Sequence, residues 1–157
     1  MFSRPRSVSL VPNPLSVRQV IASRSVCTGV CHSDIHTVRG EWGPQAYPMT
    51  VGHEMVGTVA EIGAEVTKHE VGDKVGVGTM VNACRRCEYC LNGQEQYCAD
   101  GNIQAYAGVD RDGTITQGGY STHAVVIEDF VLKIPDAIPF EAAELVRAPA
   151  GWAGDAV

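Results

Sequence analysis

The stretch CRRCEYCLNGQEQYC, residues 84–98, contains four of the six cysteines of this 157-residue chain. Its spacing is C-x2-C-x2-C-x7-C, formed by Cys84, Cys87, Cys90 and Cys98. Tight turns aim the closely spaced sulfurs at one point, and the longer gap lets the chain return to complete a tetrahedron. Four thiolates predict a closed zinc site with a structural role. An iron–sulfur centre is the alternative, because its cysteine runs are similar, although no proline follows the last cysteine.

The composition is typical of one globular domain. The chain is 45% hydrophobic and 19% charged, and its 17 glycines and eight prolines favour turns and a β-rich fold. No apolar run reaches the roughly 20 residues that span a bilayer, so we expect no membrane partner. The N-terminus lacks the apolar core of a secretory signal. We therefore expect a cytoplasmic protein whose thiols stay reduced.

The net charge of −6 is unevenly distributed along the chain. Residues 1–33 contain four arginines and no acid, and the rest of the chain carries all 18 acidic residues. An acidic body lacks the basic surface that binds phosphates, so we expect no nucleic-acid partner. The basic head resembles a transit peptide, but we favour an irregular N-terminal arm over residues 1–16.

Hydrophobic alternation and turn residues predict a mainly β protein with short helices. We expect strands at 17–26, 55–62, 120–127 and 130–134, a turn followed by a strand at 72–78, and short helices at 33–39 and 141–146. This order predicts one barrel-like or sandwich-like domain over residues 17–145. The cysteine lobe at 84–98 projects from it, and residues 146–157 form a tail.

A second group of metal-ligand types lies in GVCHSDIH (29–36) and GHEMVG (52–57). Cys31 and His53 supply the soft thiolate and the imidazole that a catalytic zinc uses. Glu54 follows His53 directly and offers a carboxylate, either as a spare ligand or as a partner outside the ligand set. The two segments therefore predict a second zinc site, this one catalytic.

Three residues near these ligands are candidates for supporting roles. Asp34 is expected to accept a hydrogen bond from the ring of His53, as carboxylates near zinc-binding histidines do. Ser33 and His36 are three residues apart on the expected helix, so they can share a face and pass a proton. Each such residue alone is more often an ordinary packed or surface side chain, and only their grouping favours a site.

The segments GVCHSDIH, GHEMVGTV and GDKVGVG, the four-cysteine stretch and GGYSTHAVV occur in the order typical of zinc-dependent medium-chain alcohol dehydrogenases. Residues 26–144 resemble the cinnamyl-alcohol-dehydrogenase-like branch, whose members are NADP-dependent reductases of aldehydes. The resemblance implies a GroES-like β-barrel that holds two zinc ions. It also implies NADP as cofactor and a small alcohol or aldehyde as substrate.

The resemblance also implies roles for single residues: catalytic zinc ligands at Cys31 and His53, a proton relay at Ser33 and His36, a contact to the cofactor pyrophosphate at His32, and a substrate-pocket position at Trp42. The simpler interpretation of Trp42 is a packed loop anchor. In the family, zinc polarises the substrate oxygen, the relay moves the hydroxyl proton, and a nicotinamide exchanges hydride.

The sequence departs from the family pattern in three ways. The ends, residues 1–16 and 146–157, resemble the family only weakly. The other two departures concern the ligands and the cofactor. Trp152 stands in APAGWAG (148–154), where the family has a third cysteine ligand, and an indole offers no lone pair to a metal. No G-x-G-x-x-G occurs within a βαβ pattern, so we expect the Rossmann domain that binds the dinucleotide to be missing and the chain to be truncated before it. We therefore expect a weakened catalytic zinc site and no activity for the chain alone.

Two functions stay open at this point. The first is the zinc-binding catalytic domain of an NADP-dependent alcohol dehydrogenase. The second is a non-catalytic structural zinc module that forms a homo-oligomer or associates with a full-length relative through exposed apolar surface. Redox sensing through Cys27 or Cys31 is a weaker third alternative, because Cys27 is most simply a small buried residue.

Overall fold

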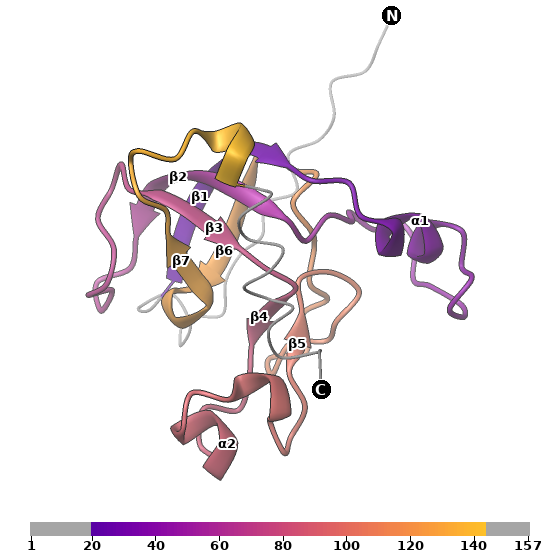
Figure 1. Ribbon diagram of the computed structural model, residues 1–157. Coiled ribbons are helices and arrows are strands. Elements are labelled where there is room, and N and C mark those ends of the chain that lie inside the picture. Colours follow the sequence, from indigo (N-terminus) through magenta and orange to yellow (C-terminus); the bar gives the residue numbers. More distant parts are fainter. Residues whose placement is uncertain (1–19, 144–157) are drawn as a thin grey trace, which may run out of the picture.

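The computed structural model describes residues 20–143 of the chain (Figure 1). The elements occur in the order β1 Val20–Thr28, α1 His32–Val38, β2 Met55–Ile62, β3 Lys74–Val77, β4 Met80–Asn82, α2 Glu88–Leu91, η2 Glu95–Tyr97, β5 Ile103–Gln104, β6 His123–Ile127, η3 Glu128–Phe130 and β7 Val131–Lys133. Residues 140–143 are also helical. The predicted arm 1–16, the tail 146–157 and Trp152 lie outside the described residues.

Five strands form one antiparallel sheet in the order β6-β1-β2-β3-β7, and β4 pairs with β5 in a separate two-stranded sheet. The prediction of a mainly β fold with short helices is confirmed. Within residues 20–143 the large sheet does not close on itself, since its edge strands β6 and β7 are joined through η3 and do not pair with each other. β6 begins at His123 rather than at residue 120, because the preceding chain hydrogen-bonds to residues 50–52 instead of entering the sheet.

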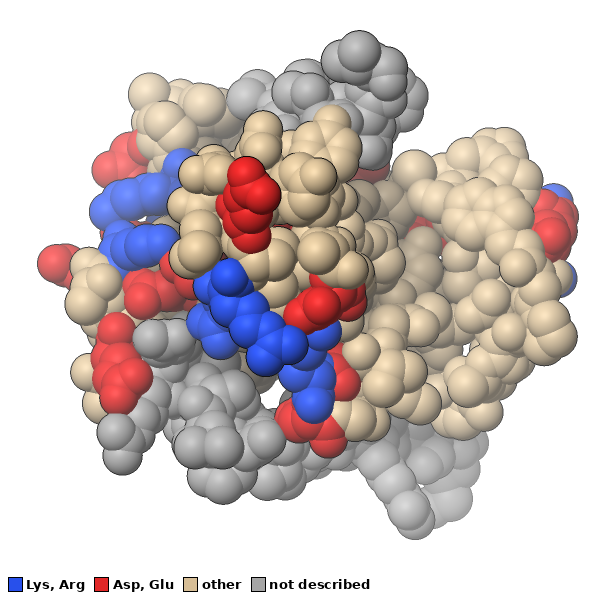
Figure 2. Space-filling view, turned by 90° about the horizontal axis from the view of Figure 1, so that it is seen from below, with Lys and Arg blue, Asp and Glu red and all other residues tan. Residues whose placement is uncertain are grey.

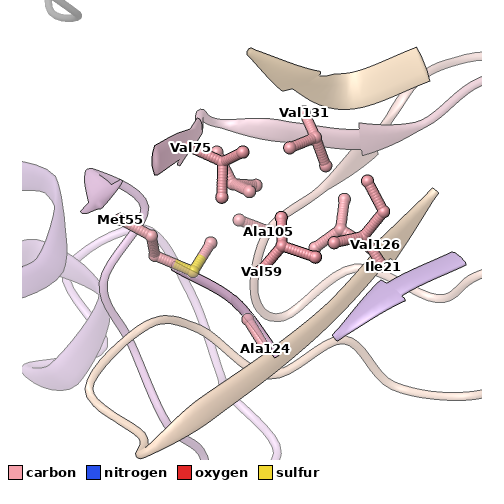
Figure 3. Close-up of a cluster of buried hydrophobic side chains, with 9 residues drawn as sticks. Ile21, Met55, Val59, Val75, Ala105, Ala124, Val126 and Val131 are labelled. Carbon is pink, nitrogen blue, oxygen red and sulfur yellow. The ribbon is translucent and has the colours of Figure 1, made fainter. Parts of the chain in front are cut away.

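The central strand β2 has both faces covered along its first half. Met55 and Val59 point into the main hydrophobic cluster, whereas Val56 on the opposite face packs with Ile134 and Ala143. Side chains alternate across a strand, so this pattern matches the alternation in the sequence. The main cluster (Figure 3) combines side chains from all five strands of the large sheet with Ala105, which follows β5, and contains Ile21, Met55, Val59, Val75, Val77, Ala105, Ala124, Val126 and Val131.

Two protrusions leave the large sheet in different directions (Figure 1). One contains α1 and the loop that follows it, and the other contains α2 and the four cysteines, with β4 and β5 at its base. None of the helices within residues 20–143 has the length and the apolar character to span a membrane. Both predicted sites therefore lie on segments that project from the sheet.

Truncating a side chain of the main cluster should destabilise the domain. Val59 is 1% exposed, and Val59→Ala should lower the free energy of unfolding by about 2 kcal/mol, through lost burial and the cavity that remains. Urea unfolding followed by circular dichroism measures this difference. Val109 is 62% exposed, so Val109→Ala is the matched control and should have little effect. Equal losses in both variants would contradict the assignment of the core.

Candidate zinc sites and substrate pocket

The buried carboxylate of Asp34 joins the segments that carry the second group of ligands. Asp34 lies in the first turn of α1 and is only 3% exposed. Its Oδ2 accepts the N–H of Cys31 at 3.1 Å and the hydroxyl of Tyr120 at 3.2 Å. Its Oδ1 accepts the N–H of Gly52 at 3.1 Å and faces Nδ1 of His53 at 3.2 Å. One side chain thus aligns three separate segments of the chain.

The contact with Asp34 also orients the imidazole of His53. A carboxylate accepts, so Nδ1 of His53 donates, and the lone pair of the ring lies on Nε2. Metal-ligating atoms of Cys31, His53 and Glu54 lie within 4.8 Å of one another. A thiolate, an imidazole and a carboxylate are all zinc donors, so these three residues fit a zinc ion. The structure thus places together all three predicted ligands.

Two glycines allow these segments to approach one another. Gly52 has φ +101°, in the left-handed region, and a Cβ there would lie 2.9 Å from Cγ2 of Thr28 and 3.1 Å from the backbone nitrogen of Tyr120. A Cβ on Gly29 would collide with the carboxylate of Glu54. A larger residue at Gly29 would therefore displace the side chain of Glu54, and one at Gly52 would be strained and would crowd the backbone of Tyr120.

A pocket of roughly 330 Å³ lies beside His53. Its walls come from α1, the following loop, the residue just before β4, and β5 with the segment after it, and include Ser33, Thr37, Trp42, Thr79, Tyr106 and Gly108. Trp42 therefore lies on the pocket wall, at the position that the family resemblance implied, although 63% of its surface is exposed. Aromatic and hydroxyl side chains around a concave site suit a small molecule with few polar groups.

The two predicted relay residues make different hydrogen bonds. Ser33 lies on the pocket wall and its hydroxyl donates to Sγ of Cys31 at 3.0 Å. His36 hydrogen-bonds through Nδ1 to Glu41, and its ring stacks on Trp42 with centroids 5.0 Å apart. The bond from His36 lowers the pKa of Glu41. Glu41 is a supporting residue that the sequence did not identify, because no local motif indicates its contact with His36.

Two tyrosines near the site were also missed. Burial raises the pKa of Tyr106 to about 12 and that of Tyr120 to about 12, and the negative charge of Asp34 adds to both shifts. Tyr106 lies on the pocket wall with its ring 5.7 Å from that of His53. His32, in contrast, is exposed at the first residue of α1, and its ring tilts against that of His36 at 4.7 Å.

The four cysteines of the lobe converge as their spacing predicted. Their sulfurs lie within 4.8 Å of one another, and Sγ of Cys84 is 3.8 Å from Sγ of Cys90. A tetrahedral zinc site with Zn–S bonds of about 2.3 Å places its sulfurs about 3.8 Å apart. This convergence on one point fits a single ion better than a multi-iron cluster, in which the thiolates bind different irons. Cys90 and Cys98 are buried, and the cluster packs against Phe130.

Backbone groups in the lobe point at the sulfurs and favour thiolates. The N–H of Cys84 donates to Sγ of Cys98 at 3.4 Å, and the N–H of Cys87 donates to Sγ of Cys84 at 3.3 Å. The N–H groups of Cys90 and Ala99 lower the pKa of Cys87 to about 6. Burial raises the pKa of Cys90 to about 12, and binding a metal ion would favour its thiolate.

An antiparallel β domain that carries a four-cysteine lobe and a separate cysteine–histidine–glutamate group beside a pocket belongs to the class of zinc-dependent dehydrogenase domains. The family described as the alcohol dehydrogenase GroES-like domain matches residues 20–136. The chain therefore belongs to this family, and the family predicted from the sequence is confirmed.

Relatives of known name agree with this assignment. Over 116 residues the chain is 56% identical to NADP-dependent alcohol dehydrogenase C 1 of Mycolicibacterium smegmatis. The match covers 73% of this chain and 33% of the relative. It is 52% identical to cinnamyl alcohol dehydrogenase 8 of Arabidopsis thaliana over 115 residues, or 73% of this chain and 32% of the relative. The chain thus spans about a third of the length of these relatives.

Solved structures show the same likeness. A cinnamyl alcohol dehydrogenase of Sorghum bicolor superposes with a TM-score of 0.78 at 40% identity, covering 87% of this chain and 41% of that one. The cinnamyl alcohol dehydrogenase of Helicobacter pylori, solved with NADP(H), also gives 0.78, at 35% identity, covering 87% and 42% of the two chains.

Replacing the buried carboxylate of Asp34 should destabilise the domain even without metal. Asp34→Asn keeps the shape of the side chain but turns one acceptor into a donor that faces other donors. We expect the free energy of unfolding to fall by about 2–3 kcal/mol, because hydrogen bonds to a buried charge are among the stronger ones. Urea unfolding with a zinc chelator present isolates this effect. Asp136→Asn, at an exposed position, is the control, and equal stability of both variants would contradict the role of Asp34.

The raised pKa of Tyr106 predicts a pH dependence of stability. A folded pKa above the unfolded value of about 10 means that Tyr106 stabilises the fold fully below pH 10 and loses this contribution as the pH rises through about 12. When the phenolate absorbance of the folded protein is followed against pH, the wild type should show a rise near pH 12 that Tyr106→Phe lacks. Loss of a component near pH 10 would show that Tyr106 is solvated.

Proposed function

We propose that this chain is the zinc-binding, substrate-side domain of an NADP-dependent alcohol dehydrogenase, which interconverts a small alcohol and its aldehyde. The observation that carries the proposal is the approach of ligand atoms from Cys31, His53 and Glu54 to within 4.8 Å of one another beside the pocket. The names of the relatives, which include NADP-dependent and cinnamyl alcohol dehydrogenases, support the same reaction class.

In this proposal, Cys31, His53 and Glu54 hold a catalytic zinc, which when bound supplies a Lewis acid that polarises the substrate oxygen. Glu54 would take the place of the third ligand. The family has a cysteine at that position, but this chain has Trp152, which cannot bind a metal. The bond from His53 to Asp34 holds the imidazole in the tautomer that can bind metal. The hydroxyl of Ser33, which donates to the thiolate of Cys31, stabilises its negative charge.

Ser33 and His36 would carry the proton away from a bound alcohol: Oγ of Ser33 would accept that proton while the hydroxyl proton of Ser33, which is donated to Sγ of Cys31 in the structure, turns and passes toward the imidazole of His36. Ser33 lies on the pocket wall, where its oxygen can hydrogen-bond a substrate hydroxyl. His36 is held by Glu41 and by stacking on Trp42, and 33% of its side chain is exposed, so it can exchange a proton with solvent. The carboxylate of Glu41 would stabilise the imidazolium that forms. Trp42 and Tyr106 would enclose the organic part of the substrate.

The nicotinamide would be held by polypeptide beyond the described residues. All strand pairs within residues 20–143 are antiparallel, so this part of the chain contains no βαβ unit for a dinucleotide. His32 is exposed and available to a cofactor pyrophosphate. We therefore propose that residues 20–143 alone have negligible activity, and that association with a full-length relative, which would bring a dinucleotide-binding domain, completes the site.

Cys84, Cys87, Cys90 and Cys98 would hold a second, structural zinc, because four thiolates leave no position for substrate. All six cysteines are free of disulfides. Reduced thiols organised around metal are typical of cytoplasmic proteins, and we propose that location here.

Counting zinc in variants tests both sites. The purified full chain should bind about two zinc ions, one per site. Cys31→Ser should bind about one, because it loses a ligand of the proposed catalytic site only. Cys27 is a half-buried cysteine whose sulfur contacts the carbonyl of Phe140, outside both clusters. Cys27→Ser is therefore the matched control and should keep two. Elemental analysis after dialysis gives the ratio.

Each result of the zinc count has a definite meaning. One zinc in both the wild type and Cys31→Ser would overturn the catalytic site and favour a structural zinc module instead. No zinc in the wild type would overturn both sites. Aldehyde reduction by NADPH provides an independent test, since substantial turnover by the zinc-loaded chain alone would contradict the proposed need for further polypeptide.

A further inference from the structure

A hairpin over residues 105–116 connects the substrate pocket with the cysteine lobe. Its two arms pair through Val109 and Ile115, and the N–H of Ala107 donates to the carbonyl of Thr116 at 3.2 Å. The base of the hairpin lies on the pocket wall, whereas Arg111 near its tip reaches the lobe. The hairpin is thus in contact with both candidate sites.

The guanidinium of Arg111 binds the end of the cysteine stretch. Its Nη2 donates to the carbonyl of Gly101 at 2.7 Å and to that of Asp100 at 3.4 Å, and lies 4.0 Å from Sγ of Cys98. The turn that presents Arg111 is itself held, because Oδ1 of Asp110 accepts the N–H of Arg111 at 2.7 Å. The side chain therefore holds the chain immediately after Cys98 and approaches the sulfur of that residue.

The charge of Arg111 is directed at the sulfur cluster. Four thiolates around a divalent zinc carry a net charge of −2, and a nearby guanidinium offsets part of it. Arg86, within the lobe, pairs with the carboxylate of Asp100 at 2.9 Å and also interacts with Cys84. The guanidinium of Arg111 hydrogen-bonds to two neutral carbonyls and a sulfur. The hydrogen bond from Arg86 lowers the pKa of Asp100, and the charge of Arg111 also helps to lower it. Figure 2 shows basic side chains among acidic ones on the face from which the lobe projects.

We propose that Arg111 is a positioning residue for the zinc of the four-cysteine lobe: it holds the Cys98 ligand in place, offsets the thiolate charge, and ties the metal centre to the hairpin that forms the pocket wall. This inference rests on the proposed zinc in that lobe. The zinc ion would then stabilise two parts of the domain: the lobe that binds it and, through Arg111, the hairpin on the pocket wall.

Zinc release from the zinc-loaded full chain to a chromophoric chelator tests the role of Arg111. Loss of an outer partner of a metal ligand typically weakens binding 10–100-fold, so Arg111→Ala should release the zinc of the lobe at least about tenfold faster than the wild type. Arg24 is exposed on β1, so Arg24→Ala removes the same charge without touching the hairpin and should release zinc like the wild type. Unchanged release by Arg111→Ala would overturn the proposal.

Two further measurements distinguish loss of the contact between Arg111 and the lobe from a general destabilisation of the domain. With cobalt in the four-cysteine site, Arg111→Ala should shift the sulfur-to-cobalt charge-transfer band, and Arg24→Ala should not. With zinc in excess, hydrogen exchange at the amide of Ala107 should accelerate in Arg111→Ala, whereas exchange at Val59 in the sheet should not change. An unshifted band together with unchanged exchange would contradict the contact.

A conservative variant covers the case in which Arg111→Ala does not fold. Arg111→Lys keeps the charge but not the planar fork of donors, so it should still release zinc several-fold faster than the wild type, and release at the wild-type rate would overturn the proposal. Failure of the proposed zinc site can be distinguished from failure of the proposed role of Arg111. A wild-type chain without zinc in the lobe would remove the metal site, whereas a zinc-loaded wild type with unaffected Arg111 variants would remove only the role of Arg111.

Discussion

The carboxylate of Asp34 is the interaction on which the candidate catalytic site depends. It is buried and faces four donors, which come from Cys31, Gly52, His53 and Tyr120. A buried charge is tolerable only when it is hydrogen-bonded this fully. A helix of seven residues such as α1 is not stable by itself. The same bonds that satisfy the charge therefore also fix α1 against the segments that carry Gly52, His53 and Tyr120, and place the ligands.

The sheet and the protrusions have different physical roles. The sheet supplies the rigid hydrophobic core, and the segments that leave it carry the polar chemistry, as loops on a stable scaffold commonly do. Each protrusion needs its own polar anchor, because neither buries enough apolar surface to be stable alone. For α1 the anchor is Asp34, and for the lobe it is the group of four sulfurs. The hairpin 105–116 lies between them and touches both.

Local features were predictable from the sequence. The strand expected at 55–62 is β2 with the same bounds, and the helix expected at 33–39 corresponds to α1 within a residue at each end. The four-cysteine cluster followed from spacing, because short gaps restrict where the sulfurs can point. Glu41, Tyr106 and Tyr120 were missed for the opposite reason. Tyr120, for example, meets Asp34 across 86 residues of sequence, and no local pattern reports such a contact.

The sequence by itself determined the metal-ligand types, their spacing, the β-rich fold and the family. All of these are encoded in short segments, where the identity of a few neighbouring residues limits the backbone. Only the tertiary structure decided which side chains share one carboxylate, which tyrosines are buried beside it, and that the sheet stays open between β6 and β7 in the described residues. Those properties depend on packing between distant segments, whose free energy is set by the whole fold rather than by any one stretch of chain.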